Sequence, residues 1–375
     1  MMRLKSMKMF MPVDKKYLIG GIVVVFLLDF LGLFSKIFEK DYHTNFNYPY
    51  DVNVTLLVDK LEKGLIPDVR PINTYNFDYV ISNGKKCTDR NRPRLVYMVK
   101  SSIDHFDRRE TIRRTWGFEN RFSDVKIYTL FILGSTSDKN LMNMVMGESV
   151  KYGDIIQLNF IDSYYNNTIK TMSGIKWITE FCPKSRFYFF SDDDMYVSTK
   201  NVLRFLRNPT KYPDYLNFPS LESKNHKSVK KKKFGDEIRH VVNYDLPENI
   251  TLYTGYVFIS SPHRHKMGKW YVSLKEYPYN SWPPYVTAGS YILSKNALFK
   301  LYYGSFYTKH FKFDDIYLGI VAQKVGIQLF HSDNFYFYKK NYNLFSYKYV
   351  IASHGYDNVK ELEKVWNEQK EAGNA

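Results

Sequence analysis

The sequence predicts an α/β domain in which helices flank a mostly parallel central sheet. Short apolar runs rich in Val, Ile, Tyr and Phe alternate with segments whose apolar residues recur at helical spacing. Strands that alternate with helices are typical of crossover units, which place successive strands side by side in parallel. The chain has 375 residues, of which 44% are hydrophobic and 18% aromatic, so it can bury a substantial core.

An apolar segment lies near the beginning of the chain. Residues 17–34 carry one charge, Asp29, and several basic residues precede them. About eighteen apolar residues is near the lower limit for a spanning helix, and preceding basic residues favour a cytosolic N-terminus. We therefore expect a cytosolic tail over residues 1–16 and a transmembrane signal-anchor helix over residues 17–34. A cleaved signal peptide is the alternative. Asp29 could snorkel to the interface or pair in a homodimer.

The next segment, residues 35–91, has no sustained periodicity and is interrupted by Pro and Asn, which predicts a luminal stem. Sequons for N-glycosylation begin at Asn53, Asn166 and Asn249 and agree with a luminal location. Cys87 and Cys182 could form a disulfide in an oxidising compartment or remain buried free thiols.

Two predicted strands, residues 94–100 and 125–133, enclose a helical segment with paired arginines. Arg109 and Arg113 are four residues apart, so they share one helical face. Their planar guanidinium groups suit a diphosphate or uracil, because each offers bidentate donors. The alternative is a solvated basic helix face.

Another predicted strand, residues 186–190, leads directly into three acidic residues, Asp192, Asp193 and Asp194. Neighbouring carboxylates repel one another and shift each other's pKa unless something neutralises them. A divalent cation such as Mg²⁺ or Mn²⁺ would do so and would leave coordination positions for a nucleotide diphosphate. The alternative is an Asp-rich turn that caps a helix over residues 197–206.

Strands are also predicted over residues 256–260 and 285–293, followed by a helix over residues 295–303. In such sheets ligands bind beyond the carboxyl ends of the strands, where the acidic triplet should lie. A second acidic pair, Asp314 and Asp315, opens a further apolar segment. It could simply favour a helix start through the helix dipole, or one carboxylate could be the general base that activates a hydroxyl.

The formal net charge of +16 raises the question of nucleic-acid binding. Much of the excess lies in the N-terminal tail and in a Lys-rich run over residues 224–240, and it is not patterned along a helix. We therefore expect no nucleic-acid partner. The Lys-rich run is interpreted as a solvated loop, with contact to anionic lipid headgroups as the alternative.

Six stretches, taken together, resemble the β-1,3-glycosyltransferases of family 31. They are RRETIRRTWG (108–117), FILGS (131–135), YGDIIQLNFIDSYYNNTIKT (152–171), FYFFSDDDMYV (187–197), WPPYVTAGSYILS (282–294) and FDDIYLGIVAQKVGI (313–327). The resemblance implies a GT-A-like fold, a catalytic domain over residues 92–345 and a C-terminal extension over residues 346–375. The last two stretches are most similar to brainiac-type members, which transfer N-acetylglucosamine from UDP-GlcNAc to a mannose of a glycosphingolipid.

The resemblance also implies residue roles. Asp194 would bind Mn²⁺, Asp192 and Asp193 would contact the ribose or the metal's water, and Asp315 would be the catalytic base. Further residues are implied at the nucleotide pocket (Arg109, Arg113, Lys170), at the meeting point of donor and acceptor (Gly289), and as an additional metal ligand (His331).

The implied reaction is inverting transfer from a UDP-sugar, in β-1,3 linkage, to a glycan or glycolipid acceptor. Alternatives are a β-1,3-galactosyltransferase that uses UDP-galactose and a non-catalytic Golgi lectin or partner protein. The implied location is the Golgi membrane, as a single-pass type II protein with a luminal catalytic domain.

Overall fold

The computed structural model describes residues 14–48, 52–87, 92–216 and 246–375. The chain divides into two compact units. The smaller unit comprises Met1–Asn47 and Ile259–Trp282, and the larger comprises Tyr48–Phe258 and Pro283–Ala375. The Lys-rich run over residues 224–240 lies outside the described residues.

The larger unit is built on a sheet of eight strands among the described residues, in the order β1-β4-β3-β2-β5-β8-β7-β9. The strands are β1 (Tyr79–Ile81), β2 (Leu95–Lys100), β3 (Ile127–Ser135), β4 (Ile155–Ile161), β5 (Phe187–Asp192), β7 (Tyr253–Phe258), β8 (Tyr285–Ser294) and β9 (Leu329–His331). Every residue of β2 and β3 is buried, which explains their unbroken apolar sequences.

The sheet is mixed, which corrects the prediction of a mostly parallel one. Parallel pairs join β2 to β3, β2 to β5, β3 to β4 and β7 to β9. The pairs β1–β4, β5–β8 and β7–β8 are antiparallel. No helix of the described chain lies between β7 and β8, and strands joined without a crossover helix pair antiparallel.

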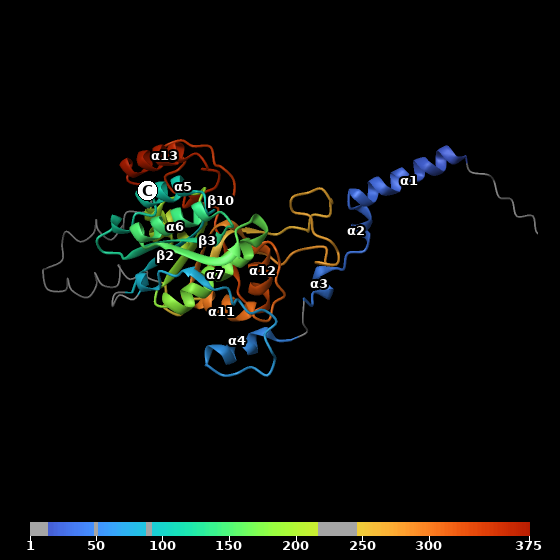
Figure 1. Ribbon diagram of the computed structural model, residues 1–375, viewed down its shortest axis with the longest axis horizontal. Coiled ribbons are helices and arrows are strands. Elements are labelled where there is room, and N and C mark those ends of the chain that lie inside the picture. The colour runs from blue at the N-terminus through green and yellow to red at the C-terminus, as the bar shows by residue number, and fades with distance from the viewer. Residues whose placement is uncertain (1–13, 49–51, 88–91, 217–245) are drawn as a thin grey trace, which may run out of the picture. The chain divides into compact units, whose positions relative to one another are not determined.

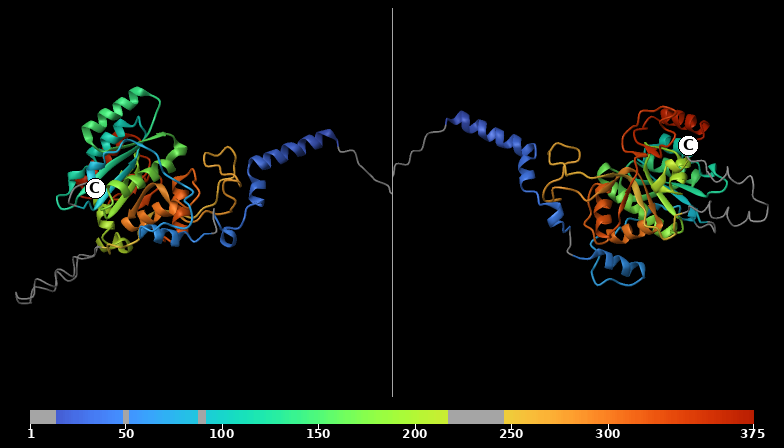
Figure 2. Two further views of the ribbon diagram at one scale, coloured as in Figure 1. Left: turned by 60° about the horizontal axis from the view of Figure 1, so that its bottom comes forward. Right: turned by 180° about the vertical axis from the view of Figure 1, so that it is seen from behind.

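Helices cover both faces of this sheet. On one side lie α5 (Phe106–Arg114), α6 (Lys139–Tyr152) and α13 (Val359–Glu371), and on the other α7 (Asn167–Phe181), α11 (Lys295–Ser305) and α12 (Asp314–Lys324) (Figure 1). Figure 2 shows the sheet between these two helix layers from two further directions. Two shorter helices, α4 (Val54–Glu62) and α8 (Thr199–Phe205), complete the unit, with single helical turns over Gly84–Cys87, Glu119–Arg121, Tyr164–Asn166, Pro209–Lys211 and Asp214–Leu216. The α/β class predicted from the sequence is therefore confirmed.

A small second sheet incorporates the predicted C-terminal extension into the larger unit. It consists of β6 (Tyr196–Val197), β10 (Phe335–Tyr336) and β11 (Ala352–Ser353). Beyond it, α13 buries Leu362, Val365 and Trp366 in the core. Residues 346–375 are thus an integral part of the fold and not an appendage.

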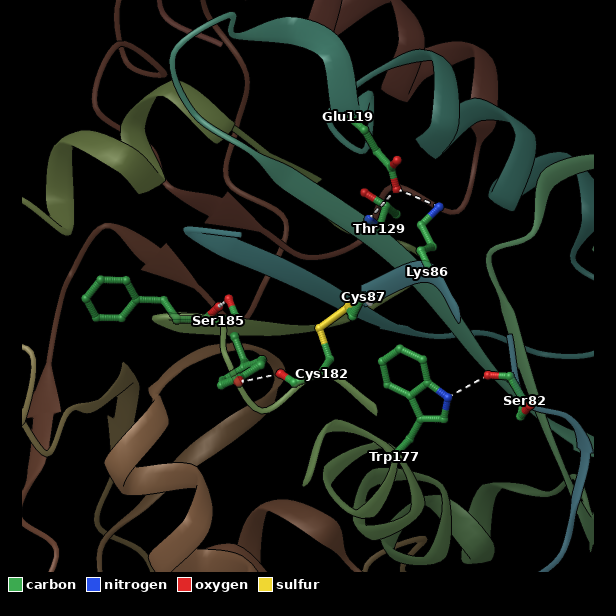
Figure 3. Close-up of a disulfide and its surroundings, with 10 residues drawn as sticks. Ser82, Lys86, Cys87, Glu119, Thr129, Trp177, Cys182 and Ser185 are labelled. Atoms are coloured by element: carbon green, nitrogen blue, oxygen red, sulfur yellow. Dashed lines mark hydrogen bonds and ion pairs between the residues drawn. A yellow bond between two sulfur atoms is a disulfide. The ribbon is translucent and has the colours of Figure 1, made fainter. Parts of the chain in front are cut away.

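A disulfide joins Cys87 to Cys182, which decides between the two states considered from the sequence. It ties the turn before β2 to the residue that follows α7 (Figure 3). Nearby, the Trp177 indole donates a hydrogen bond to the Ser82 carbonyl at 2.6 Å (Figure 3). These contacts, together with β1, show that the later part of the predicted stem, residues 35–91, belongs to the larger unit.

The smaller unit contains α1 (Lys15–Phe30), α2 (Leu33–Ile37) and α3 (Tyr42–Asn45). The transmembrane helix expected over residues 17–34 is not found, because α1 has 16 residues and Gly32 then adopts a left-handed φ of 81°. Among the described residues, no helix combines the length and the apolar character needed to cross a membrane. Asp29 is paired within this unit, with its carboxylate 2.6 Å from the Lys266 ammonium.

Candidate functional site

Three side chains with metal-ligand chemistry meet at the end of β5. Asp192, Asp194 and His354 each offer one ligand atom, and these atoms lie within 4.8 Å of one another. The Nε2 atom of His354 is 3.3 Å from Oδ2 of Asp194. We refer to Asp192, Asp194 and His354 as the metal-ligand group. Among the described residues, no other cluster of His, Cys, Asp or Glu side chains has this geometry.

Strand pairing explains how His354 reaches the acidic residues. β11 runs antiparallel to β6, with Ser353 opposite Tyr196. Because β6 begins two residues after Asp194, this register brings His354 level with Met195 and so next to Asp194. The Tyr356 N–H then donates to the Asp194 carbonyl at 2.7 Å and fixes both segments.

The group fits a divalent cation. Oδ1 of Asp194 is buried and has no hydrogen-bond partner in the described part of the chain. A buried carboxylate oxygen in that condition is costly unless a ligand satisfies it. Two carboxylates with one imidazole suit Mn²⁺ and related first-row ions. Burial raises the pKa of Asp192 to about 6, and the neighbouring charge of Asp194 adds to that effect, so an added positive charge would be stabilising here.

A buried lysine connects this group to the second acidic pair. Nζ of Lys100 lies 3.0 Å from Oδ1 of Asp192 and 2.8 Å from Oδ2 of Asp314. The Thr171 hydroxyl also donates to Oδ2 of Asp314, at 2.7 Å. Burial alone would lower the pKa of Lys100, but the two carboxylates outweigh it and raise that pKa. Lys100 is therefore a permanent cation between β5 and α12.

The two members of the second pair differ in environment. Burial would raise the pKa of Asp314, but Lys100 and Thr171 hold it below its ordinary value. For Asp315, burial together with the charge of Asp314 outweighs the Ile316 N–H and Lys100, and raises the pKa to about 7. Oδ1 of Asp315 accepts the Ile316 N–H at 2.8 Å. A carboxylate with a pKa near neutrality can both take up and release a proton.

Asp193, the middle residue of the triplet, points away from the metal-ligand group. Its carboxylate accepts the Ser101 hydroxyl at 2.7 Å and lies 2.8 Å from His105 Nδ1 and 3.0 Å from Arg108 Nη1. Burial would raise the pKa of Asp193, but these partners lower it. Asp193 thus ties the end of β5 to α5, and its expected contact with the ribose or the metal's water stays a prediction.

Arg109 and Arg113, which are expected to line a nucleotide pocket, have internal partners in the structure. Arg109 is fully buried and donates to Glu148, to the Ser101 hydroxyl and to the carbonyls of residues 102 and 103. Arg113 lies 2.7 Å from Glu148 and 2.8 Å from Asp154. Guanidinium groups saturated in this way hold α5 against the sheet and have few donors left for a ligand.

Lys170 also has internal partners. It is buried, with Nζ 2.7 Å from Oδ1 of Asp162 and 2.8 Å from the Ser101 carbonyl. Lys170 thus links α7 to the loop after β2, and its expected contact with UDP stays a prediction.

Of the two remaining predicted site residues, Gly289 borders the metal-ligand group and His331 is not part of it. A Cβ on Gly289 would lie 3.5 Å from the His354 ring, so this glycine borders the metal-ligand group. His331 is not a member of that group. Its Nδ1 accepts the Val257 N–H at 3.1 Å, and its Nε2 lies 2.9 Å from the exposed Asp333.

The three sequon asparagines differ in exposure. Asn53 and Asn249 are exposed, whereas Asn166 is half-buried and its amide donates to the Ile161 carbonyl at 2.8 Å. The use of the three sequons stays a prediction.

Sequence reasoning did not identify His354 or Lys100. His354 follows a short apolar run, residues 349–352, which could have been interpreted as a buried strand and so as part of the fold. Lys100 ends the first predicted strand, as the acidic triplet ends another. Since parallel strands end at one edge of a sheet, that shared position was the available signal.

Comparisons with known proteins identify the family of the chain. A family model described as Galactosyltransferase matches residues 107–249 and 236–333. Beta-1,3-galactosyltransferase brn of Drosophila melanogaster is 40% identical over 353 residues, covering 94% of this chain and 95% of that protein. Beta-1,3-galactosyltransferase 1 of Mus musculus is 32% identical over 299 residues, 80% of each chain. The mixed sheet between two helix layers agrees with the expected GT-A-like fold. The chain therefore belongs to the galactosyltransferase family, the β-1,3-glycosyltransferases of family 31, and is a hexosyltransferase.

Proposed function

We propose that the chain is an inverting, metal-dependent transferase that moves a sugar from a UDP-sugar, in β-1,3 linkage, to a glycan acceptor. The observation that carries this proposal is the buried, unpartnered Oδ1 of Asp194 beside Asp192 and His354. These three residues would hold the cation. When bound there, a divalent cation supplies positive charge at the diphosphate oxygens of the donor and its leaving group.

Asp315 is proposed as the general base. The acceptor hydroxyl oxygen forms a bond to the anomeric carbon while the bond from that carbon to the diphosphate oxygen breaks. The proton passes to the Asp315 carboxylate, and the electron pair of the broken bond leaves with UDP. One displacement on an α-linked donor gives a β-linked product. The raised pKa of Asp315 supports this role, because a base with a pKa near the working pH transfers protons most effectively.

Lys100 and Asp314 are proposed to position these groups. Lys100 bridges Asp192, a proposed metal ligand, and Asp314, which precedes the base in the first turn of α12. The bridge fixes the distance between the metal side and the base side of the site. The Lys100 ammonium also offsets part of the negative charge of the four carboxylates in the site, which belong to Asp192, Asp194, Asp314 and Asp315.

Two donors are supported by different observations. The sequence resemblance to brainiac-type members implies UDP-GlcNAc, with a mannose of a glycosphingolipid as acceptor. The names of the fly and mouse relatives instead specify galactosyl transfer, which favours UDP-galactose as the second candidate. We further propose that the reaction takes place in the Golgi lumen. The Cys87–Cys182 disulfide supports an oxidising compartment.

The test is transfer by the full chain with Mn²⁺, in which both UDP-sugars are offered with a β-mannosyl and a β-galactosyl oligosaccharide. Formation of a β-1,3-linked product from either donor, abolished by a chelator and restored by Mn²⁺, is the expected result. A product with α linkage, or transfer that is unaffected by the chelator, would refute the proposed mechanism.

A further inference from the structure

Four aromatic side chains gather near the ends of β7 and β8. The ring centroid of Phe337 is 4.7 Å from that of Tyr256 and 4.7 Å from that of Phe258. Tyr285 stacks on Phe258 at a centroid distance of 5.9 Å. We refer to Tyr256, Phe258, Tyr285 and Phe337 as the aromatic cluster.

Strand register places the aromatic cluster at the same edge of the sheet as the acidic triplet. β8 is antiparallel to β5, with Ser290 opposite Ser191. The residues of β8 that precede Ser290 therefore continue past the level of Asp192. Tyr285, the first residue of β8, pairs with Phe258, the last residue of β7.

The aromatic cluster also lies beside the helix that carries the proposed base. A Cβ on Gly319 would be 2.6 Å from Cβ of Tyr285, so α12 packs directly against this residue. Asp315 and Gly319 are four residues apart and share one face of the helix. Tyr285 consequently flanks the helix face that begins with Asp315.

The side chains here are partly exposed although β8 is a central strand. β8 has a neighbouring strand on each side, yet Tyr285, Ala288 and Gly289 are only partly buried. Tyr256 and Phe258 are likewise partly buried, and Phe337 is 40% exposed. Clustered aromatic surface beside a group of polar side chains is characteristic of small-molecule sites.

On the basis of the proposed function, we propose that the aromatic cluster is the subsite for a sugar ring of the acceptor. One face of a pyranose presents C–H groups and packs on an aromatic ring, while its hydroxyls stay free for hydrogen bonds. A diphosphate needs cations or N–H donors, and the four rings supply neither. The aromatic cluster therefore suits the neutral acceptor, and its position would direct an acceptor hydroxyl toward Asp315.

The test compares Phe337→Ala with Phe118→Ala in the full chain. Phe118 is 49% exposed and lines a separate depression with Tyr152 and Trp366, so it is a matched control. We expect Phe337→Ala to raise KM for a soluble oligosaccharide acceptor roughly two- to tenfold. KM for the UDP-sugar and the rate of donor hydrolysis without acceptor should not change. Phe337→Trp should restore the acceptor KM, and Phe118→Ala should leave it unaltered.

Other outcomes separate this subsite from the proposed function. An unchanged acceptor KM in Phe337→Ala would overturn the subsite while the transferase activity stands. A defect confined to lipid-linked acceptors, with the soluble oligosaccharide unaffected, would also overturn it and would assign the rings to the lipid. Absence of both transfer and donor hydrolysis in the unaltered chain would refute the proposed function and the subsite with it.

Discussion

The imidazole of His354 lies 3.3 Å from the carboxylate of Asp194, so a residue near the C-terminus completes a group that begins at the end of β5. We expect His354→Ala to weaken Mn²⁺-dependent UDP binding by at least about tenfold, because loss of a ligand costs at least as much as loss of its supporting shell. Titration calorimetry with UDP in the presence of Mn²⁺ measures this. His331→Ala is the matched control, and equal losses in the two variants would contradict the assignment.

Replacement of Asp315 by Asn should lower kcat roughly a hundredfold or more, because the acceptor hydroxyl loses its base. Affinity for UDP and Mn²⁺ should stay close to that of the unaltered chain, since Asp315 is not in the metal-ligand group. Asp333→Asn, which removes an exposed carboxylate, serves as control. Near-normal turnover in Asp315→Asn would exclude this residue as the base.

The pH dependence of stability should change in the same variant. Because the folded chain raises the pKa of Asp315 from 3.8 to about 7, it binds that proton more tightly than the unfolded chain does. The contribution of this carboxyl group to the free energy of unfolding is therefore complete below about pH 4, and it is lost as the pH rises toward 7. Thermal unfolding of Asp315→Asn and of the unaltered chain should diverge over this interval, with the variant more stable at the higher pH. Parallel curves would show that the carboxyl is not perturbed.

Lys100→Met should be strongly destabilising, by about 3–5 kcal/mol, because it leaves Asp192 and Asp314 without their shared cation. Adding Asp314→Asn should recover part of that loss, since one of the two stranded charges is then removed. Urea unfolding of the two single variants and the double variant measures the coupling. If the losses of the two single variants simply add in the double variant, the Lys100–Asp314 pair has no coupling free energy.

Arg109→Met tests whether this residue is structural. The change removes one of the two guanidinium partners of the buried Glu148 and should lower the free energy of unfolding by about 1–3 kcal/mol. At temperatures where the variant remains folded, KM for the donor should equal that of the unaltered chain. A large rise in donor KM without loss of stability would instead return Arg109 to the nucleotide pocket.

The strands and acidic residues were predictable because they depend on local pattern. Unbroken apolar runs identified β2, β3 and β5, and the position of Asp192 after such a run indicated a ligand site. The direction of β8 was not predictable in this way, because antiparallel pairing with β5 is decided by long-range contacts. The partner of Arg109 was not predictable either, because the sequence alone does not tell whether an arginine pairs with a carboxylate such as Glu148 or with a phosphate.

The metal-ligand group also depended on tertiary structure. His354 is separated in sequence from Asp194 by most of the C-terminal half of the chain, and only the β6–β11 register brings them together. His331, closer to the recognised motifs, was the more natural choice from sequence. The structure places His354, and not His331, beside Asp192 and Asp194.

The position of His354 has a consequence for how the enzyme matures. During synthesis Asp192 and Asp194 leave the ribosome long before His354, so the nascent chain carries an incomplete ligand set for most of its translation. Truncated products that end before β11 would lack the imidazole even if the large sheet had already formed. Binding of the proposed cation would thus be a late event, which follows synthesis of the chain through β11.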